Sequence, residues 1–182
     1  PLDARAQYRT TQLMSNPGAS RSLGIYLEPN LNNIMGLNLD DAISRYNVLP
    51  LELKFRRVNN ANEANITVRQ TSNQGYLMSA GFPQGGNAYP NIFVNTSFYS
   101  SAFARNDATS ALVHEIGHCI GLRHTDYMDT RFSNCSSGGN EGNAGVGAIH
   151  IPSTPSQPES NSVMLACSNN VDRPFTNGDI SA

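Results

Sequence analysis

The feature that most constrains this chain is a run of eleven residues that holds three of its four histidines. The run begins with His114 and Glu115, places His118 one helical turn later, and continues through Gly121 to His124. Residues four apart lie on one face of an α-helix, so the imidazoles of His114 and His118 can reach a single metal ion. Gly121 favours the left-handed backbone that ends a helix, which would allow the chain to bring His124 back to the same ion.

This set of ligands indicates catalysis more than structural support. Three histidines leave one position of a tetrahedral zinc ion open, whereas structural zinc sites close all four positions with protein atoms. Glu115 projects from the flank of the histidine face, where its carboxylate can touch a water molecule at the open position without ligating the metal. We therefore predict one catalytic zinc ion with His114, His118 and His124 as ligands and with Glu115 as the general base and acid.

The extended pattern resembles the signature of the metzincin clan of zinc metallopeptidases. A second element agrees with it, because Ser162, Val163 and Met164 follow His124 by about forty residues and are similar to the Met-turn. In metzincins the methionine of this turn packs beneath the zinc histidines. Astacins place a tyrosine two residues after that methionine as an extra zinc ligand, but Ala166 occupies this position here. The resemblance implies Met164 as the Met-turn residue and no tyrosine ligand after it.

Within the clan, three segments resemble the HEIGH metallopeptidases, a family of secreted bacterial enzymes. They are residues 114–118, which read His-Glu-Ile-Gly-His, residues 124–127 and residues 147–152. The resemblance implies a secreted, extracellular zinc endopeptidase that acts on proteins or peptides and has an inhibitory pro-segment. It also implies an α+β metzincin fold, in which a twisted, mixed five-stranded sheet and two long helices precede an irregular subdomain with the Met-turn.

The hydrophobic pattern along the chain gives the same order of elements. Alternating apolar residues predict strands at residues 22–27, 51–56, 65–71, 76–82 and 92–95, and an amphipathic stripe predicts a helix over residues 40–49. The zinc helix is expected to begin near Asn106 and Asp107, which can cap it, and to run to Leu122. We expect the first twenty residues to lie on the body as a polar arm, residues 125–161 to be mostly irregular, and a helix to begin near residue 176. The chain is expected to form one catalytic domain, residues 1–182, with subdomains at 1–124 and 125–182.

The resemblance also implies how a substrate is held. A peptide would lie extended against an edge strand, with Leu77, Met78, Ser79 and Ala80 as its pairing residues. Leu165 and the residues that follow it to 171 would form the wall of the pocket for the residue after the scissile bond. His150, the one histidine outside the motif, could line the cleft and help to stabilise the oxyanion, or it could have a structural role.

Composition agrees with a folded, secreted enzyme and limits its partners. The chain has 182 residues, of which 38 % are apolar and 14 % are charged, and its formal net charge is −2. The absence of Lys/Arg runs argues against nucleic acid and against an anionic membrane as the main partner. No apolar stretch approaches the roughly 18 residues that span a bilayer. Because the chain begins at Pro1, we expect a mature form, free of its signal and pro-segment, and we expect a monomer.

The three cysteines have different expected roles. Cys119 falls on the apolar side of the zinc helix and is expected to be a small buried side chain. Cys135 and Cys167 lie in the loop-rich part of the chain, where a disulfide would help an extracellular enzyme, so we favour this pair. Spacing alone does not establish connectivity, and an unpaired cysteine is the remaining alternative.

Two further features are less specific. Residues 134–143 are rich in Asn and Gly and could hold Ca²⁺ through their oxygen atoms, although their spacing matches no recognised calcium loop. Asp126 could accept a hydrogen bond from a zinc histidine or from the backbone after His124, or it could simply stabilise a turn. Two other functions stay open, a zinc hydrolase of a non-peptide amide and a non-enzymatic, metal-stabilised binding module. Glu115 argues against the second, since a structural zinc site needs no carboxylate beside an open position.

Overall fold

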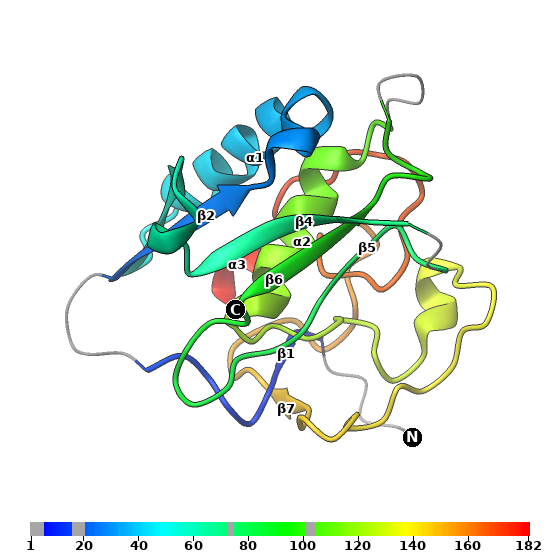
Figure 1. The fold of residues 1–182 in the computed structure, drawn as a ribbon. Coiled ribbons are helices and arrows are strands. Elements are labelled where there is room, and N and C mark those ends of the chain that lie inside the picture. The colour runs from blue at the N-terminus through cyan, green and yellow to red at the C-terminus, as the bar shows by residue number, and fades with distance from the viewer. Residues whose placement is uncertain (1–5, 16–20, 73–74, 101–104) are drawn as a thin grey trace.

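A computed structural model describes residues 6–15, 21–72, 75–100 and 105–182 of the chain. Its main layer is a five-stranded sheet in the order β3-β2-β4-β6-β5 (Figure 1). The strands are β2 (Arg21–Leu27), β3 (Leu53–Val58), β4 (Ile66–Thr71), β5 (Met78–Ala80) and β6 (Asn91–Asn95). Neighbouring strands are parallel except for β5, which pairs antiparallel with β6 at the sheet edge. The predicted mixed five-stranded sheet is thus confirmed.

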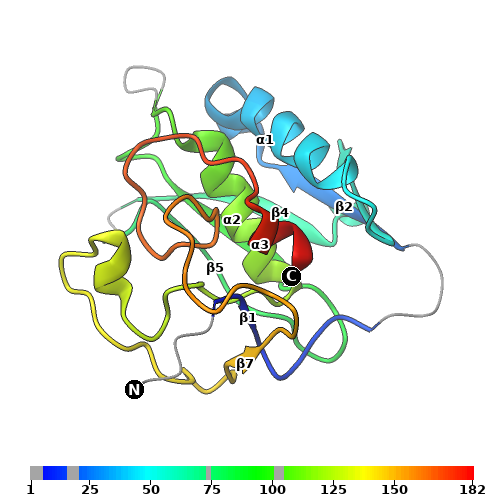
Figure 2. The same ribbon diagram turned by 180° about the vertical axis from the view of Figure 1, so that it is seen from behind.

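Both long helices, α1 and α2, lie on one face of this sheet, behind it in Figure 1 and in front of it in Figure 2. The first helix, α1 (Asn32–Asn47), begins eight residues before the predicted start at residue 40. A short 3-10 turn, Pro29–Leu31, leads directly into it. The earlier start was missed because its first two turns carry Gly36 and several asparagines, which have low helix propensity, although Met35 and Leu39 are fully buried there.

The second helix, α2 (Ala108–Ile120), carries His114 and His118 and ends two residues before the predicted end at Leu122. Gly121 adopts a φ of 120°, and its N–H donates to the carbonyl oxygens of Gly117 and His118, which terminates the helix. At the other end Asp107 occupies the N-cap position, but its side chain does not cap the helix. Its carboxylate instead pairs with Arg105 at 2.7 Å, because the guanidinium is a stronger partner than a backbone N–H.

The N-terminal arm is partly buried and forms a β-strand, although its polar sequence suggested that it would only lie on the surface of the body. Strand β1 (Tyr8–Arg9) pairs antiparallel with β7 (Ile149–His150), so the arm joins the C-terminal half of the chain. Within it, Ala6, Gln7 and Tyr8 are buried. Residues 1–5 and 16–20 of the predicted arm lie outside the described residues.

The region after His124 contains little regular structure, as expected. It holds a 3-10 turn, Thr130–Ser133, the strand β7 and the final helix α3 (Asn177–Ser181). Helix α3 begins with a capping box in which Thr176 and Asp179 exchange side-chain and backbone hydrogen bonds. Among the helices of the described residues, none is both long and apolar enough to cross a membrane.

Candidate metal and active site

The three histidines of the motif meet at one point. The Nε2 atom of His124 lies 3.2 Å from Nε2 of His114 and 3.1 Å from Nε2 of His118. In the described part of the chain, this is the one group of three or more His, Cys, Asp or Glu side chains whose ligand atoms come together closely enough for a metal ion. Helix α2 positions two of the rings and the turn after Gly121 returns the third, as the spacing predicts.

Hydrogen bonds at the opposite ring nitrogens turn all three Nε2 atoms toward that point. The Nδ1 atom of His114 lies 2.8 Å from the carbonyl oxygen of Val163, and that of His118 lies 2.7 Å from the carbonyl oxygen of Leu122. Because a carbonyl oxygen only accepts, each Nδ1 must donate its hydrogen, which leaves the Nε2 lone pair free. Burial lowers the pKa of His114 to about 3, helped by the neighbouring His124, so its imidazole is neutral, the form that ligates metals.

Glu115 lies beside this cluster and is buried. The backbone N–H of Ala80 is hydrogen-bonded to its carboxylate, and burial raises the pKa of Glu115 to about 8 despite that bond. Its Oε2 atom is the one buried side-chain oxygen or nitrogen without a hydrogen-bond partner among the described residues. A buried carboxylate oxygen without a hydrogen-bond partner destabilises the fold. Its position beside three convergent imidazoles therefore suggests that it contacts a bound ligand.

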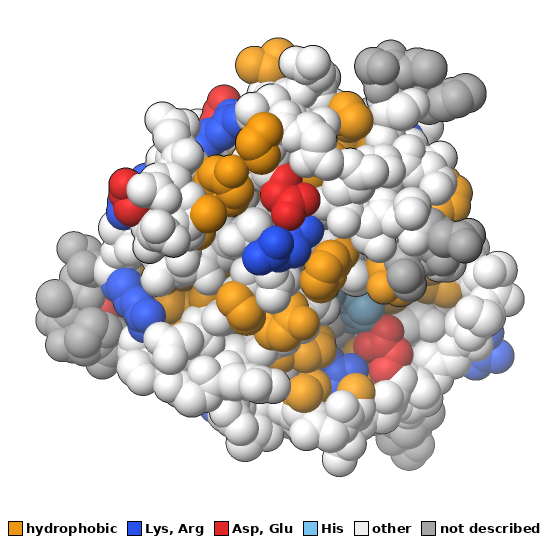
Figure 3. Space-filling view, viewed as in Figure 1, with side chains coloured by type: hydrophobic (Ala, Val, Ile, Leu, Met, Phe, Trp, Pro, Cys, Tyr) orange, Lys and Arg blue, Asp and Glu red, His pale blue; other side chains and the backbone are white. Residues whose placement is uncertain are grey.

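A cavity of about 310 Å³ opens next to His114 and Glu115. In the space-filling view a histidine surface lies in a hollow, beside an acidic side chain and hydrophobic side chains (Figure 3). The cavity wall is mostly apolar and includes Leu165 and Val171, the two ends of the predicted wall. Leu77 and Met78 also line it, whereas Ser79 and Ala80 do not.

The four predicted pairing residues divide into two sets. The N–H of Asn95 in β6 donates to the carbonyl oxygen of Leu77 at 3.0 Å, and Ser79 is paired with Phe93. Because main-chain groups alternate sides along a strand, Leu77 and Ser79 direct theirs toward β6. Met78 and Ala80 therefore face the outer edge, where the N–H of Ala80 already meets Glu115.

Met164 is fully buried against the zinc helix. A Cβ atom added to Gly117 would lie 2.7 Å from its sulfur and 3.2 Å from the hydroxyl of Tyr46. Gly117 thus allows the turn that carries Met164 to pack closely against the zinc helix. This close packing outweighs the low helix propensity of glycine. The carbonyl oxygen of Met164 also accepts from the N–H of Thr125, which joins the turn to the chain after His124.

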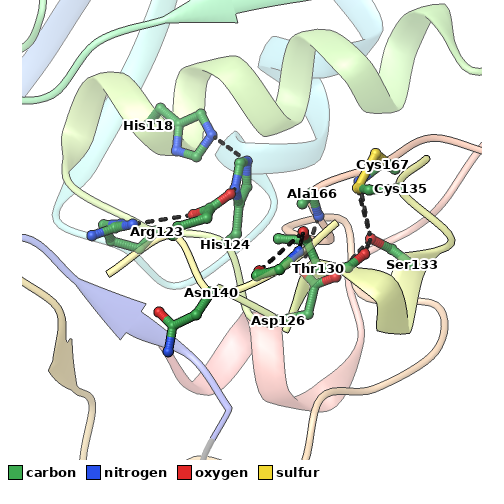
Figure 4. Close-up of polar contacts among 12 residues, drawn as sticks. His118, Arg123, His124, Asp126, Thr130, Ser133, Cys135, Asn140, Ala166 and Cys167 are labelled. Atoms are coloured by element: carbon green, nitrogen blue, oxygen red, sulfur yellow. Dashed lines mark hydrogen bonds and ion pairs between the residues drawn. A yellow bond between two sulfur atoms is a disulfide. The ribbon is translucent and has the colours of Figure 1, made fainter. Parts of the chain in front are cut away.

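Asp126 is buried but does not contact a histidine. Its two carboxylate oxygens accept from the N–H of Ala166 at 2.9 Å and from the hydroxyl of Ser133 at 2.6 Å (Figure 4). The predicted partners of this carboxylate, a zinc histidine or the backbone after His124, are thus replaced by Ser133 and by the backbone just after Met164. The disulfide between Cys135 and Cys167, the favoured pair, lies at the same place, and Cys119 is buried in the helix core as expected.

Glu141 makes the carboxylate contact that Asp126 lacks, and the sequence pattern does not predict it. Its Oε1 atom accepts from Nδ1 of His124 at 2.6 Å, and its Oε2 atom accepts from Arg123 at 3.1 Å. Although burial opposes the shift, these partners hold the pKa of Glu141 below its usual range. The only available signal was an acidic residue within a long loop after the motif, which does not single it out.

Two other predictions concern residues away from this point. His150 does not line the cavity; its ring packs against Tyr8 at 5.7 Å, and its Nε2 atom lies 3.2 Å from the hydroxyl of Thr154. This environment matches the structural alternative for His150. In the described residues no acidic cluster forms at 134–143, so the possible Ca²⁺ site gains no support.

One known structure supports the overall fold. A crystal structure of myroilysin aligns with a TM-score of 0.51 at 13 % identity, over 94 % of this chain and 96 % of that one, and therefore shares the fold. Two other solved structures align over only about half of their own length. A second myroilysin structure gives a TM-score of 0.47 at 14 % identity over 64 % of this chain and 54 % of that one. High choriolytic enzyme 1, a hatching enzyme zinc-protease from the medaka fish Oryzias latipes, gives 0.39 at 12 % identity over 61 % and 48 %.

Sequence comparison with curated proteins gives no match. The model of the dual-action HEIGH metallo-peptidases, in contrast, matches residues 2–182. That match covers almost the whole chain and includes the histidine motif on α2, the Met164 turn and the loop between them. This protein therefore belongs to the dual-action HEIGH metallo-peptidase family.

Proposed function

We propose that this chain is a secreted zinc endopeptidase that hydrolyses internal peptide bonds of extended protein substrates. The observation that carries the proposal is the convergence of three imidazoles beside the unpartnered carboxylate oxygen of Glu115. Membership of a metallopeptidase family supports the same reaction. The disulfide between Cys135 and Cys167 is consistent with an extracellular location.

The residues present fit a zinc ion. Three imidazole nitrogens with their lone pairs turned inward are a common ligand set for catalytic zinc, and each ring is fixed by a hydrogen bond from its other nitrogen. When bound, the ion would supply a Lewis acid that polarises a water molecule and the scissile carbonyl group. His114, His118 and His124 would hold it through their Nε2 atoms.

Glu115 would move the proton. Its Oε2 atom accepts a proton from the attacking water molecule and then delivers it to the leaving amine nitrogen, so the carboxylate acts first as base and then as acid. The hydrogen bond from Ala80 keeps the carboxylate in place during both steps. That bond also connects the proton-transfer group directly to the edge strand on which the substrate would lie.

The edge strand and the cavity suggest how a peptide is oriented. A substrate paired antiparallel with β5 would have its carboxyl-side residues near the start of that strand. The cavity lies at this end, since Tyr76 and Leu77 line it together with Leu165. It would therefore take the side chain after the scissile bond and set the main preference of the enzyme. Main-chain pairing through Met78 and the carbonyl oxygen of Ala80 would tolerate many other side chains.

Met164 would act as the hydrophobic floor of the site. It packs under Gly117 of the zinc helix, and the preceding carbonyl oxygen, that of Val163, orients the ring of His114. We further propose that an inhibitory pro-segment covers this cleft before activation, and that the mature enzyme works as a monomer.

Cleavage of a random peptide library, read by mass spectrometry, tests this function. We expect internal cleavage that stops when zinc is removed with a chelator and returns when zinc is added back. Cleavage that is unaffected by the chelator, or hydrolysis of non-peptide amides without any cleavage of peptides, would contradict the proposal.

A further inference from the structure

Glu141 occupies a position that no feature of the motif defines. It follows His124 by seventeen residues, in an irregular loop, yet its side chain returns to the metal site. One carboxylate oxygen meets Nδ1 of His124 at 2.6 Å and the other meets the guanidinium of Arg123 at 3.1 Å. In Figure 4 a dashed line marks the ion pair that the labelled Arg123 makes.

This contact distinguishes His124 from the other two histidines. His114 and His118 are oriented by backbone carbonyl oxygens, which belong to the fold and do not depend on a side chain. His124 is oriented by a carboxylate, which forms a charge-assisted hydrogen bond with the ring. The third ligand is therefore the one whose tautomer and direction depend on a single replaceable side chain.

Arg123 holds this carboxylate in place. Its side chain is only 2 % exposed and lies over the rings of Tyr127 and Phe82, at 5.2 and 5.9 Å from their centres. Its other terminal nitrogen donates to the carbonyl oxygens of the loop that carries Glu141, at residues Gly142, Asn143 and Gly147. The N–H of Glu141 also donates to the carbonyl oxygen of Tyr127 at 2.8 Å, so its backbone is fixed as well.

We propose that Glu141 is a positioning residue of the metal site, whose carboxylate fixes His124 as an Nε2 ligand while Arg123 anchors that carboxylate. The inference rests on the proposed metal site at the three histidines. A purely structural role, in which Glu141 only pins its loop to Arg123, makes a different prediction. It would lower the stability of the fold without changing how tightly zinc is held once the protein is folded.

Zinc affinity separates these roles. The zinc dissociation constant of the folded protein is measured by competition with a chromophoric chelator for the wild type and for Glu141→Ala, Glu141→Gln and Glu159→Gln. Loss of the carboxylate should weaken zinc binding about 10–100-fold in Glu141→Ala. Glu141→Gln should be intermediate, because its amide oxygen still accepts the Nδ1 hydrogen but lacks the charge. Glu159→Gln is the control, since Glu159 bonds to Thr176 and Gly178 away from the histidines, and its affinity should equal the wild type.

Two further measurements keep the outcome unambiguous. The visible absorption of the cobalt(II)-substituted protein should change in Glu141→Ala but not in Glu159→Gln, and thermal unfolding of the metal-free proteins reports any general loss of stability. Wild-type affinity in Glu141→Ala, with an unchanged cobalt spectrum, would overturn the inference even if that variant is less stable. If the wild type itself bound no zinc, the proposed function would fail as well, so the two failures are distinguishable.

Discussion

The zinc helix places its functional atoms through local geometry, whereas the irregular region after it places them through contacts between residues far apart in the sequence. Helix α2 supplies His114, Glu115 and His118 through local geometry, because one helical turn fixes their spacing. The region from residue 125 to 182 has little regular structure, yet it supplies the carbonyl oxygen of Val163 and the carboxylate of Glu141. Each of these contacts joins residues far apart in the sequence.

This difference shows how a region without regular secondary structure can hold functional atoms in fixed positions. Its position depends on a few cross-links of high sequence separation: the Cys135–Cys167 disulfide, the contacts of Asp126, and those of Asp179 in the last helix. Substitution of Glu115 in α2 should therefore change the chemistry with little effect on the fold. Substitutions of the cross-links should instead change the stability of the fold and only then the chemistry.

The largest effect is expected on the helix side, at Glu115. Glu115→Gln keeps the shape of the side chain but cannot take a proton, so kcat/KM for peptides should fall by roughly 10²–10⁴-fold. The zinc content should remain close to one ion per chain, because the ligands are untouched. Peptide cleavage and metal analysis of the same sample measure both quantities. The exposed Glu63→Gln serves as the control, and full activity in Glu115→Gln would refute the assigned mechanism.

The disulfide should have the next largest effect, on stability. Replacing Cys135 and Cys167 by serine removes a cross-link between residues 32 positions apart and should lower the free energy of unfolding by about 2–4 kcal/mol. Chemical denaturation of the two proteins measures the difference. The neighbouring exposed Ser136→Ala should stay within about 0.5 kcal/mol of the wild type. An unchanged midpoint in the double serine variant would show that the irregular region does not depend on this cross-link.

Asp179 is the second cross-link of the irregular region. Its buried carboxylate accepts from Gln7, Ser162, Val163 and the backbone of Thr176, so it joins the N-terminal arm to the turn before Met164. Asp179→Ala leaves buried donors without an acceptor and should cost about 2 kcal/mol of stability.

Asp41→Ala is the matched control for this prediction, because Asp41 makes an exposed ion pair with Arg45. Its effect on the free energy of unfolding should be below about 1 kcal/mol. Equal losses in the two variants, measured by the same denaturation experiment, would argue that Asp179 has no special role in holding the turn.

The smallest effect concerns the main-chain contacts of the substrate with β5. Methylation of a single backbone nitrogen in the substrate removes one hydrogen bond, which is worth about 0.5–1.5 kcal/mol, so kcat/KM should fall about 2–10-fold. A scan of such methyl groups along one peptide should show the loss at alternate residues only, since alternate groups face the strand. A uniform loss at every position would indicate that the peptide does not pair with this edge.

The sequence predicts the parts of the site that depend on local geometry. The spacing of the motif was sufficient for His114, Glu115 and His118, and Gly121 was sufficient for the return of His124. Glu141 could not be predicted, because its loop has no periodicity and its partner is defined only by the fold. His150 shows the converse, since a histidine outside the motif is conspicuous in the sequence, yet the structure places it against Tyr8 and Thr154.

The fold follows the same division. Alternating apolar residues predicted the strands of the main sheet, because each strand buries one or both of its faces. The bounds of two strands were wrong: β3 begins two residues later than predicted, and β5 covers only the middle of the predicted strand at 76–82. The predicted start of α1 was wrong because weak helix formers occupy its first turns, and burial of Met35 and Leu39 against the sheet compensates for them. The pairing of β1 with β7 was not predicted, because two-residue strands leave no pattern.

X-ray absorption at the zinc edge measures whether the helix and the irregular region share one metal ion. We expect one zinc ion with three imidazole nitrogens at about 2.0–2.1 Å and one further light atom, with no sulfur ligand. In His124→Ala the number of imidazole ligands should fall to two. A wild-type spectrum with a sulfur ligand, or one with only two imidazoles, would contradict the account.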